Sequence, residues 1–181
     1  MKTHLALLRG INVGGNKKVP MADLRAFVEK LGFQGARTLL QSGNLVFRSD
    51  GQRTDAALET FLEEEAARIL GLSTVFLIRT VEEWTEVITR NPFPGEAAKA
   101  PSHFIVMFLR EQPTSEALQR LQTAVVGDER FQLVGRHLYA VFPDGIGESR
   151  LATAMMTPRF SPCATGRNWN TVLKLAELAK G

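Results

Sequence analysis

The glycine-rich segment LLRGINVGGNKKVPM, residues 7–21, has the residue types best suited to hold a ligand. It follows an apolar run and combines three glycines with Arg9, Lys17 and Lys18. In a glycine-rich turn between a strand and a helix, consecutive backbone N–H groups can converge on one anion, and nearby cations add charge. The segment therefore predicts either a phosphate-binding loop or a tight turn that needs glycine geometry.

Two nucleotide-binding motifs do not fit this segment. Gly10 and Gly15 give the frame of a P-loop, but Asn16 stands in place of its lysine and no serine or threonine follows. The glycine spacing also differs from the dinucleotide-binding fingerprint. We therefore expect neither P-loop hydrolysis nor a bound cofactor.

Two further polar clusters interrupt the apolar pattern. Gln41, Ser42 and Asn44 surround a hairpin glycine, where they suit a turn or, alternatively, present an amide and a hydroxyl to a ligand. In RNWNT, residues 167–171, one asparagine can cap the final helix. Arg167 and Trp169 beside it suit an anion or a planar ring, although Trp169 equally suits a core position.

No catalytic or metal-binding signature accompanies these clusters. The chain lacks the G-x-S-x-G and H-E-x-x-H motifs, and His4, His103 and His137 stand far from one another and from Cys163. We expect no metal site and assign no catalytic residue. Cys163 lies near the expected start of the final helix, where a thiol can be activated, but a single cysteine is more often inert.

Composition limits the class of protein. The 181 residues are 44% apolar and 23% charged, which suits one compact domain or two small ones. The net charge is +3, from 22 lysines and arginines against 19 acidic residues, and the basic residues are scattered, so nucleic acid is permitted but not required. One cysteine excludes an intramolecular disulfide, and no apolar run reaches the length of a signal peptide or membrane span. We expect a cytoplasmic monomer or weak dimer without membrane contact.

The elements that must position the clusters follow the order β-α-β-β-α-β twice. In the first half, the pattern predicts strands at 5–8, 37–41, 45–48 and 74–78 and helices at 20–32 and 54–71. In the second half, it predicts strands at 104–109, 131–134 and 138–142, a short edge segment near 163, and helices from 114, around 151–155 and over 169–179. Three consecutive acids, Glu63, Glu64 and Glu65, splay around their helix and should mostly face solvent.

This order predicts an α+β fold, a tandem pair of ferredoxin-like (β-α-β-β-α-β) repeats with a C-terminal helix. The expected parts are a first repeat over 1–80, a linking helix and proline-rich irregular connector over 81–102, a second repeat over 103–166, and the helix over 167–181, together forming one compact unit. Ferredoxin-like sheets can bind single-stranded RNA through aromatic residues on their central strands. The first strand has none, and Tyr139 and Phe142 are out of phase with that pattern, so nucleic acid is the less favoured partner.

Several segments in the right order carry a resemblance to a known family. LLRGINVGG with KVPMADLR, LGF ahead of QSGNLVF, YAVFPDGIG and RNWNTVLKL resemble the largely bacterial family of uncharacterised proteins called domain-of-unknown-function family 1697. The resemblance covers nearly the whole chain and implies a two-repeat α+β structure related to the ferredoxin-like fold, with no activity attached. One departure is Gly166, where similar proteins tend to carry threonine.

We expect the three polar segments to share one cleft that binds a phosphorylated or carboxylated small molecule, with the arginines as charge partners. The alternatives are an enzyme that uses the same cleft, a nucleic-acid-binding protein, or polar segments with a purely structural role. The expected ligand-binding residues are Arg9, Gly10, Asn12, Gly14, Gly15, Asn16, Lys17, Gln41, Ser42, Asn44, Arg167, Asn168, Trp169 and Asn170.

Overall fold

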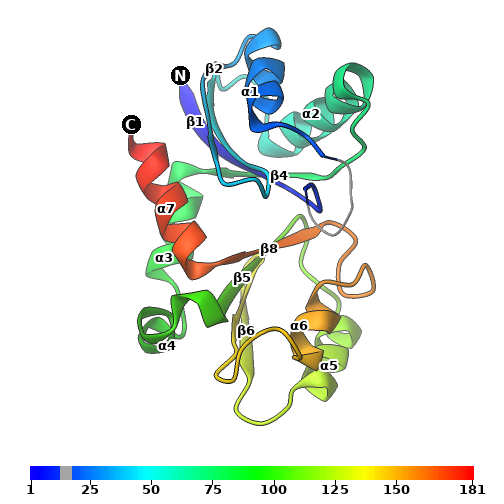
Figure 1. The fold of residues 1–181 in the computed structure, drawn as a ribbon, viewed down its shortest axis with the longest axis vertical. Helices are drawn as coiled ribbons and strands as arrows, with labels where there is room; N and C mark the ends of the chain where they lie inside the picture. The colour runs from blue at the N-terminus through cyan, green and yellow to red at the C-terminus, as the bar shows by residue number, and fades with distance from the viewer. Residues whose placement is uncertain (13–17) are drawn as a thin grey trace. The chain divides into compact units, whose positions relative to one another are not determined.

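Two antiparallel sheets of four strands organise the chain, as a computed structural model that describes residues 1–12 and 18–181 shows (Figure 1). Each sheet belongs to a separate compact unit. The first unit contains Met1–Glu86 and Lys174–Gly181, and the second contains Val87–Leu173. The boundaries between the units fall inside helices α3 (Val81–Thr89) and α7 (Trp169–Lys180).

The first unit has the ferredoxin-like strand order β2-β3-β1-β4. Its elements are β1 (Lys2–Leu8), α1 (Met21–Lys30), β2 (Gln34–Leu39), β3 (Asn44–Ser49), α2 (Asp55–Leu70) and β4 (Phe76–Thr80). Helices α1 and α2 cover one face of the sheet (Figure 1), where Leu24 and Leu62 join Leu8 in the core. The residues of β1 that face the other way, Leu5 and Leu7, are also fully buried, so this strand is buried on both faces as its continuous apolar run predicts.

The second unit repeats this order as β6-β7-β5-β8. Its elements are α4 (Pro94–Lys99), a 3-10 turn (Pro101–His103), β5 (Phe104–Leu109), α5 (Ser115–Ala124), β6 (Arg130–Val134), β7 (His137–Val141), α6 (Arg150–Met155) and β8 (Ala164–Asn168). The core under α5 and α6 gathers Leu121, Leu151 and Met155 against Met107 and Leu138 of the sheet. The predicted fold class is therefore confirmed.

Helix caps place the helices where the sequence predicts them. The hydroxyls of Thr54 and Thr114 accept hydrogen bonds from backbone N–H groups at the starts of α2 and α5, at 3.3 and 3.2 Å. Thr80 and Glu83 form the expected reciprocal capping box, because each side chain accepts a hydrogen bond from the other's backbone N–H. No helix among the described residues has both the length and the apolar character of a membrane span.

The connector between the repeats differs from the prediction. Residues 91–101 were expected to be irregular because they contain three prolines and a glycine. Instead, Pro94 opens the short helix α4 and Pro101 opens the 3-10 turn. Proline is tolerated in the first turn of a helix, where its missing N–H would have no partner within the helix.

Candidate functional site

A cleft of about 670 Å³ lies in the first unit, where β1 ends. Arg9, Gly10 and Ile11 form one side, and Glu63 and Ala67 of α2 contribute another. The segment Leu72–Val75, which leads into β4, completes the lining. The cleft is therefore lined by Arg9 and Gly10, the first two of the predicted ligand-binding residues.

The backbone of Arg9 is fixed on both sides. Its N–H donates to the Val75 carbonyl at 3.0 Å, and its carbonyl accepts from the Thr74 hydroxyl at 2.8 Å. These bonds continue the pairing of β1 with β4 beyond the ends of the strands. The backbone from which the Arg9 side chain extends is therefore fixed at the edge of the cleft. This limits the conformational entropy that the protein loses when a ligand binds.

Asn12 fastens the two ends of the glycine-rich segment together. Its amide nitrogen donates to the carbonyls of Val19, at 2.9 Å, and Gln41, at 2.7 Å, and its oxygen accepts from the Val19 N–H at 2.7 Å. The side chain was predicted to orient a ligand, but both of its polar atoms already bond to the backbone. These contacts join the first two predicted segments, which lie far apart in sequence.

The hairpin turn at residues 41–44 is also held by internal bonds. The buried Asn44 donates from its amide nitrogen to the Leu39 carbonyl at 2.8 Å and to the Ser42 hydroxyl at 3.0 Å. The Gly43 carbonyl accepts from the Leu8 N–H at 2.8 Å. Gln41 is exposed and remains available to a ligand, whereas Asn44 supports the turn.

Glu63 differs from the prediction that its helix acids face solvent. One of its carboxylate oxygens accepts from the Phe76 N–H at 2.9 Å, and Glu59 similarly accepts from the Ile78 N–H at 2.8 Å. Both N–H groups lie on β4, which is an edge strand of the sheet. The two acids therefore occupy donors that an edge strand would otherwise leave open.

The third predicted segment belongs to the second unit and is largely buried. Arg167 is 7% exposed, and its guanidinium donates to the Thr165 hydroxyl and the Gly166 carbonyl, both at 2.8 Å. Burial lowers the pKa of Arg167 to about 10. Trp169 is also 7% exposed and packs edge-on against Phe104, with 5.4 Å between ring centroids.

The start of α7 is capped as expected. The side-chain oxygen of Asn168 accepts from both the backbone N–H and the hydroxyl of Thr171, at 3.0 Å each. Among the predicted ligand-binding residues of this segment, Asn170 is exposed to solvent, whereas the side chain of Asn168 caps the helix.

Gly166, where the resemblance implies a threonine, lies beside two methionines. A Cβ at this position would stand 2.9 Å from the Met107 sulfur and 3.0 Å from the Met156 terminal carbon. The space that a threonine side chain needs is therefore filled here by flexible methionine ends. The start of α7 is capped without a hydroxyl at position 166, because the side chain of Asn168 provides the cap.

Four of the predicted ligand-binding residues, Gly14, Gly15, Asn16 and Lys17, lie outside the residues that the structure describes. Within residues 1–12 and 18–181, no group of three or more histidine, cysteine, aspartate or glutamate side chains is arranged to hold a metal ion.

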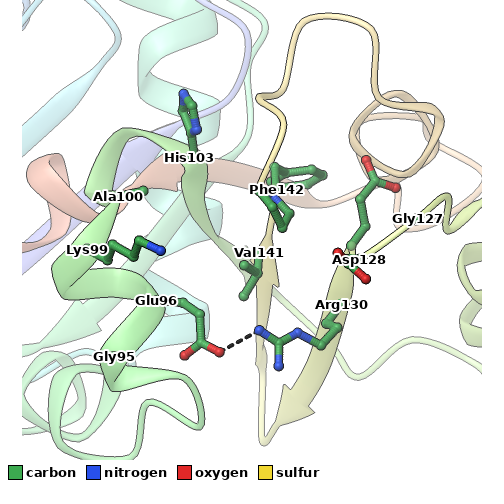
Figure 2. A pocket seen from close by; sticks show the side chains of 12 residues that line it. Gly95, Glu96, Lys99, Ala100, His103, Gly127, Asp128, Arg130, Val141 and Phe142 are labelled. Carbon is green, nitrogen blue, oxygen red and sulfur yellow. Dashed lines mark hydrogen bonds and ion pairs between the residues drawn. The ribbon is translucent and has the colours of Figure 1, made fainter.

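A second cleft, of about 870 Å³, lies in the second unit (Figure 2). Helix α4 and the 3-10 turn line one side, with Glu96, Lys99 and His103. The turn before β6 lines the other side with Asp128, and the first residue of β6, Arg130, continues that side. Sequence reasoning missed this site because it treated the proline-rich connector as irregular. Pro94 as the first residue of a helix was the signal that could have revealed it.

A serine, a histidine and an aspartate meet at the opposite end of the first sheet. The hydroxyl of Ser49 lies 2.8 Å from His4 Nε2, and the Gly51 N–H donates to Ser49 Oγ at 3.1 Å. His4 Nδ1 lies 3.8 Å from Asp55 Oδ1, too far for a hydrogen bond. The three residues are arranged in the same order as the Ser-His-Asp triad of a hydrolase. His4 is fully buried and Ser49 is only 6% exposed, so a substrate could not reach the Ser49 hydroxyl.

The fold and clefts define an α+β protein of two ferredoxin-like units, each with its own ligand-sized cleft. The family model described as "Protein of unknown function (DUF1697)" matches residues 1–139, and the chain belongs to this family, so the resemblance is confirmed. The chain is similar in fold to the solved structure of conserved bacterial protein SP0830 from Streptococcus pneumoniae. The two chains are 23% identical with a TM-score of 0.78, over 98% of each. No protein with a curated description matches the sequence.

Proposed function

We propose that the protein binds an anionic small molecule, phosphorylated or carboxylated, in the first-unit cleft with Arg9 as its charge partner. The observation that carries this proposal is the position of Arg9, which lines a cleft of about 670 Å³ and whose backbone is fixed by Thr74 and Val75 just before β4. That volume falls within the range of about 300–1,000 Å³ typical of small-molecule sites. A guanidinium is the side chain best matched to the planar or forked oxygens of carboxylate and phosphate.

The rest of the lining favours a ligand that also carries hydroxyl groups. Ser73 and Thr74 add hydroxyls, and Glu63 adds a carboxylate already engaged with the Phe76 N–H. A bare anion would be repelled by Glu63, whereas a ligand hydroxyl can donate to its oxygen. A sugar phosphate therefore fits this lining better than inorganic phosphate does.

Thermal unfolding with three added compounds tests the proposal. Glucose 6-phosphate supplies the anion and the hydroxyls, inorganic phosphate supplies the anion alone, and glucose supplies the hydroxyls alone. Binding at 100 times the Kd stabilises the folded state by about 2.7 kcal/mol. We expect glucose 6-phosphate to raise the Tm most and glucose to leave it unchanged.

A pair of variants assigns the effect to the cleft. Arg9→Gln removes the charge partner, and Lys30→Gln removes one positive charge from the exposed end of α1 in the same unit. The shift produced by glucose 6-phosphate should disappear in Arg9→Gln and persist in Lys30→Gln. An equal shift in both variants would show that the anion binds elsewhere, and no shift in the wild-type protein would end the proposal for sugar phosphates.

A further inference from the structure

The two sides of the cleft in the second unit come from different parts of the chain, and an ion pair connects them. Glu96 of α4 accepts a hydrogen bond from the guanidinium of Arg130, at the start of β6, and the two form a salt bridge (Figure 2). Arg130 also lies over the Phe93 ring, 5.4 Å from its centroid. These contacts connect the helix side of the cleft to the strand side without using its other charged groups.

The charges outside this ion pair have opposite signs on the two sides. Lys99 lies on the side formed by α4 and the 3-10 turn, with the imidazole of His103, and Asp128 lies on the side of β6 (Figure 2). In the described part of the chain, the side chains of Lys99 and Asp128 make no hydrogen bond or ion pair, with each other or with any other residue. Both are exposed, so they remain hydrated and available to a ligand.

Apolar groups lie between the two charged sides. Val141 and Phe142, at the end of β7, line the cleft together with Ala100 and Pro143. Glu129, a further acid of the lining, already accepts a hydrogen bond from the Val126 N–H at 3.0 Å and shapes the turn. A ligand in this cleft therefore meets a cationic side, an anionic side and apolar surface between them.

We propose that this cleft binds a zwitterionic amino acid or short peptide, with Lys99 holding the carboxylate and Asp128 the ammonium group. A purely anionic ligand would be attracted by Lys99 but repelled by Asp128 and its acidic neighbours, whereas a dipolar ligand satisfies both sides. The volume of about 870 Å³ lies in the upper part of the range for ligand sites, which favours a peptide over a single amino acid. Apolar side chains of the ligand would cover Val141 and its neighbours.

Capped ligands test the two charges separately in calorimetric titrations of the full chain. Leucyl-leucine carries both charges, its N-acetyl form lacks the ammonium, and its C-terminal amide lacks the carboxylate. Each cap should weaken binding about tenfold or more, because a hydrogen bond to a charged group is lost. Free leucine distinguishes the ligand sizes, since it should bind more weakly than leucyl-leucine if a peptide is preferred.

Matched variants then assign each ligand charge to one residue. In Asp128→Asn, leucyl-leucine and its N-acetyl form should bind equally, while the amide remains weaker. In Lys99→Gln, the free peptide and its amide should bind equally. The control Glu111→Gln removes an exposed charge of the same unit outside the cleft and should bind like the wild-type protein.

Two results would overturn this inference. One is the absence of binding by any uncapped peptide at millimolar concentration. The other is binding that neither the caps nor the Asp128 and Lys99 substitutions weaken, which would place the peptide elsewhere. Because both residues are exposed, unchanged urea midpoints of the ligand-free variants will show that they fold.

Discussion

Substituting Gly43 by alanine tests how tightly the hairpin turn is packed against the end of β1. Gly43 has a φ of +75°, in the left-handed region that disfavours residues with a Cβ. An added Cβ would lie 2.8 Å from both Leu8 Cβ and Ile11 Cδ1. The Leu8 carbon is close to the backbone and cannot rotate away, so the chain itself must shift.

The cost has two parts. Left-handed backbone costs a residue with a Cβ about 1–2 kcal/mol, and overpacking a well-packed core costs about 1–3 kcal/mol. Gly43→Ala should therefore lower the free energy of unfolding by about 2–5 kcal/mol. Gly51 is the matched control, because its φ is +78° but its nearest contact would be Lys2 Cβ at an ordinary 3.7 Å. Gly51→Ala should cost only the backbone part, about 1–2 kcal/mol.

Both substitutions lie in the first compact unit, and urea unfolding followed by circular dichroism measures the stability of each variant. The midpoint of Gly43→Ala should fall further than that of Gly51→Ala, with the slope of each transition unchanged. Equal losses in the two variants would refute the reasoning, because they would mean that the close approach to Leu8 contributes nothing.

Three further predictions concern buried or capping groups. Burial lowers the pKa of His4 below its ordinary value of 6.5, so the unfolded chain binds the proton more readily than the folded one. The free energy of unfolding of the wild-type protein should therefore be highest above about pH 6.5 and fall as the pH is lowered toward the folded-state pKa. Urea unfolding between pH 8 and pH 5 measures this dependence, which should be shallower in His4→Gln. Thr114→Ala removes the cap of α5 and should lower the free energy of unfolding by about 1 kcal/mol in urea titrations, whereas Thr114→Ser should retain most of it. Arg167→Ala leaves buried hydrogen-bonding groups without their donor, so the Tm should drop by the equivalent of about 2 kcal/mol or more. An unchanged Tm in calorimetry would instead favour the expectation that Arg167 serves a ligand.

The fold could be predicted because local signals agreed with one another. Capping threonines, glycines at helix C-termini and stripes of apolar residues predicted the helices. The repeated order of elements predicted two ferredoxin-like sheets. The strand limits differ from the prediction, since β1 begins at Lys2, three residues before its apolar run, and β4 is shifted by two residues. Pairing with neighbouring strands decides these limits, and single-sequence patterns do not contain that information.

The site could be predicted only in part. The sequence predicted that three polar segments meet in one cleft. Asn12 joins the first two of them, and the third, at residues 167–170, belongs to the second unit. The sequence did not reveal that the side-chain amides of Asn12 and Asn44 donate hydrogen bonds to backbone carbonyls, because asparagine is common both in turns and in ligand sites. The charges of the second cleft, on Lys99 and Asp128, are separated in sequence, and only the fold brings them to the same cleft.

Calorimetric titration of glucose 6-phosphate into the wild-type protein, Arg9→Gln and Lys30→Gln tests the central claim most directly. If the anion lies against Arg9, the Kd should rise about tenfold or more in Arg9→Gln and stay unchanged in Lys30→Gln, and the ligand-free variants should unfold at similar urea concentrations. The same Kd in all three proteins would contradict the account.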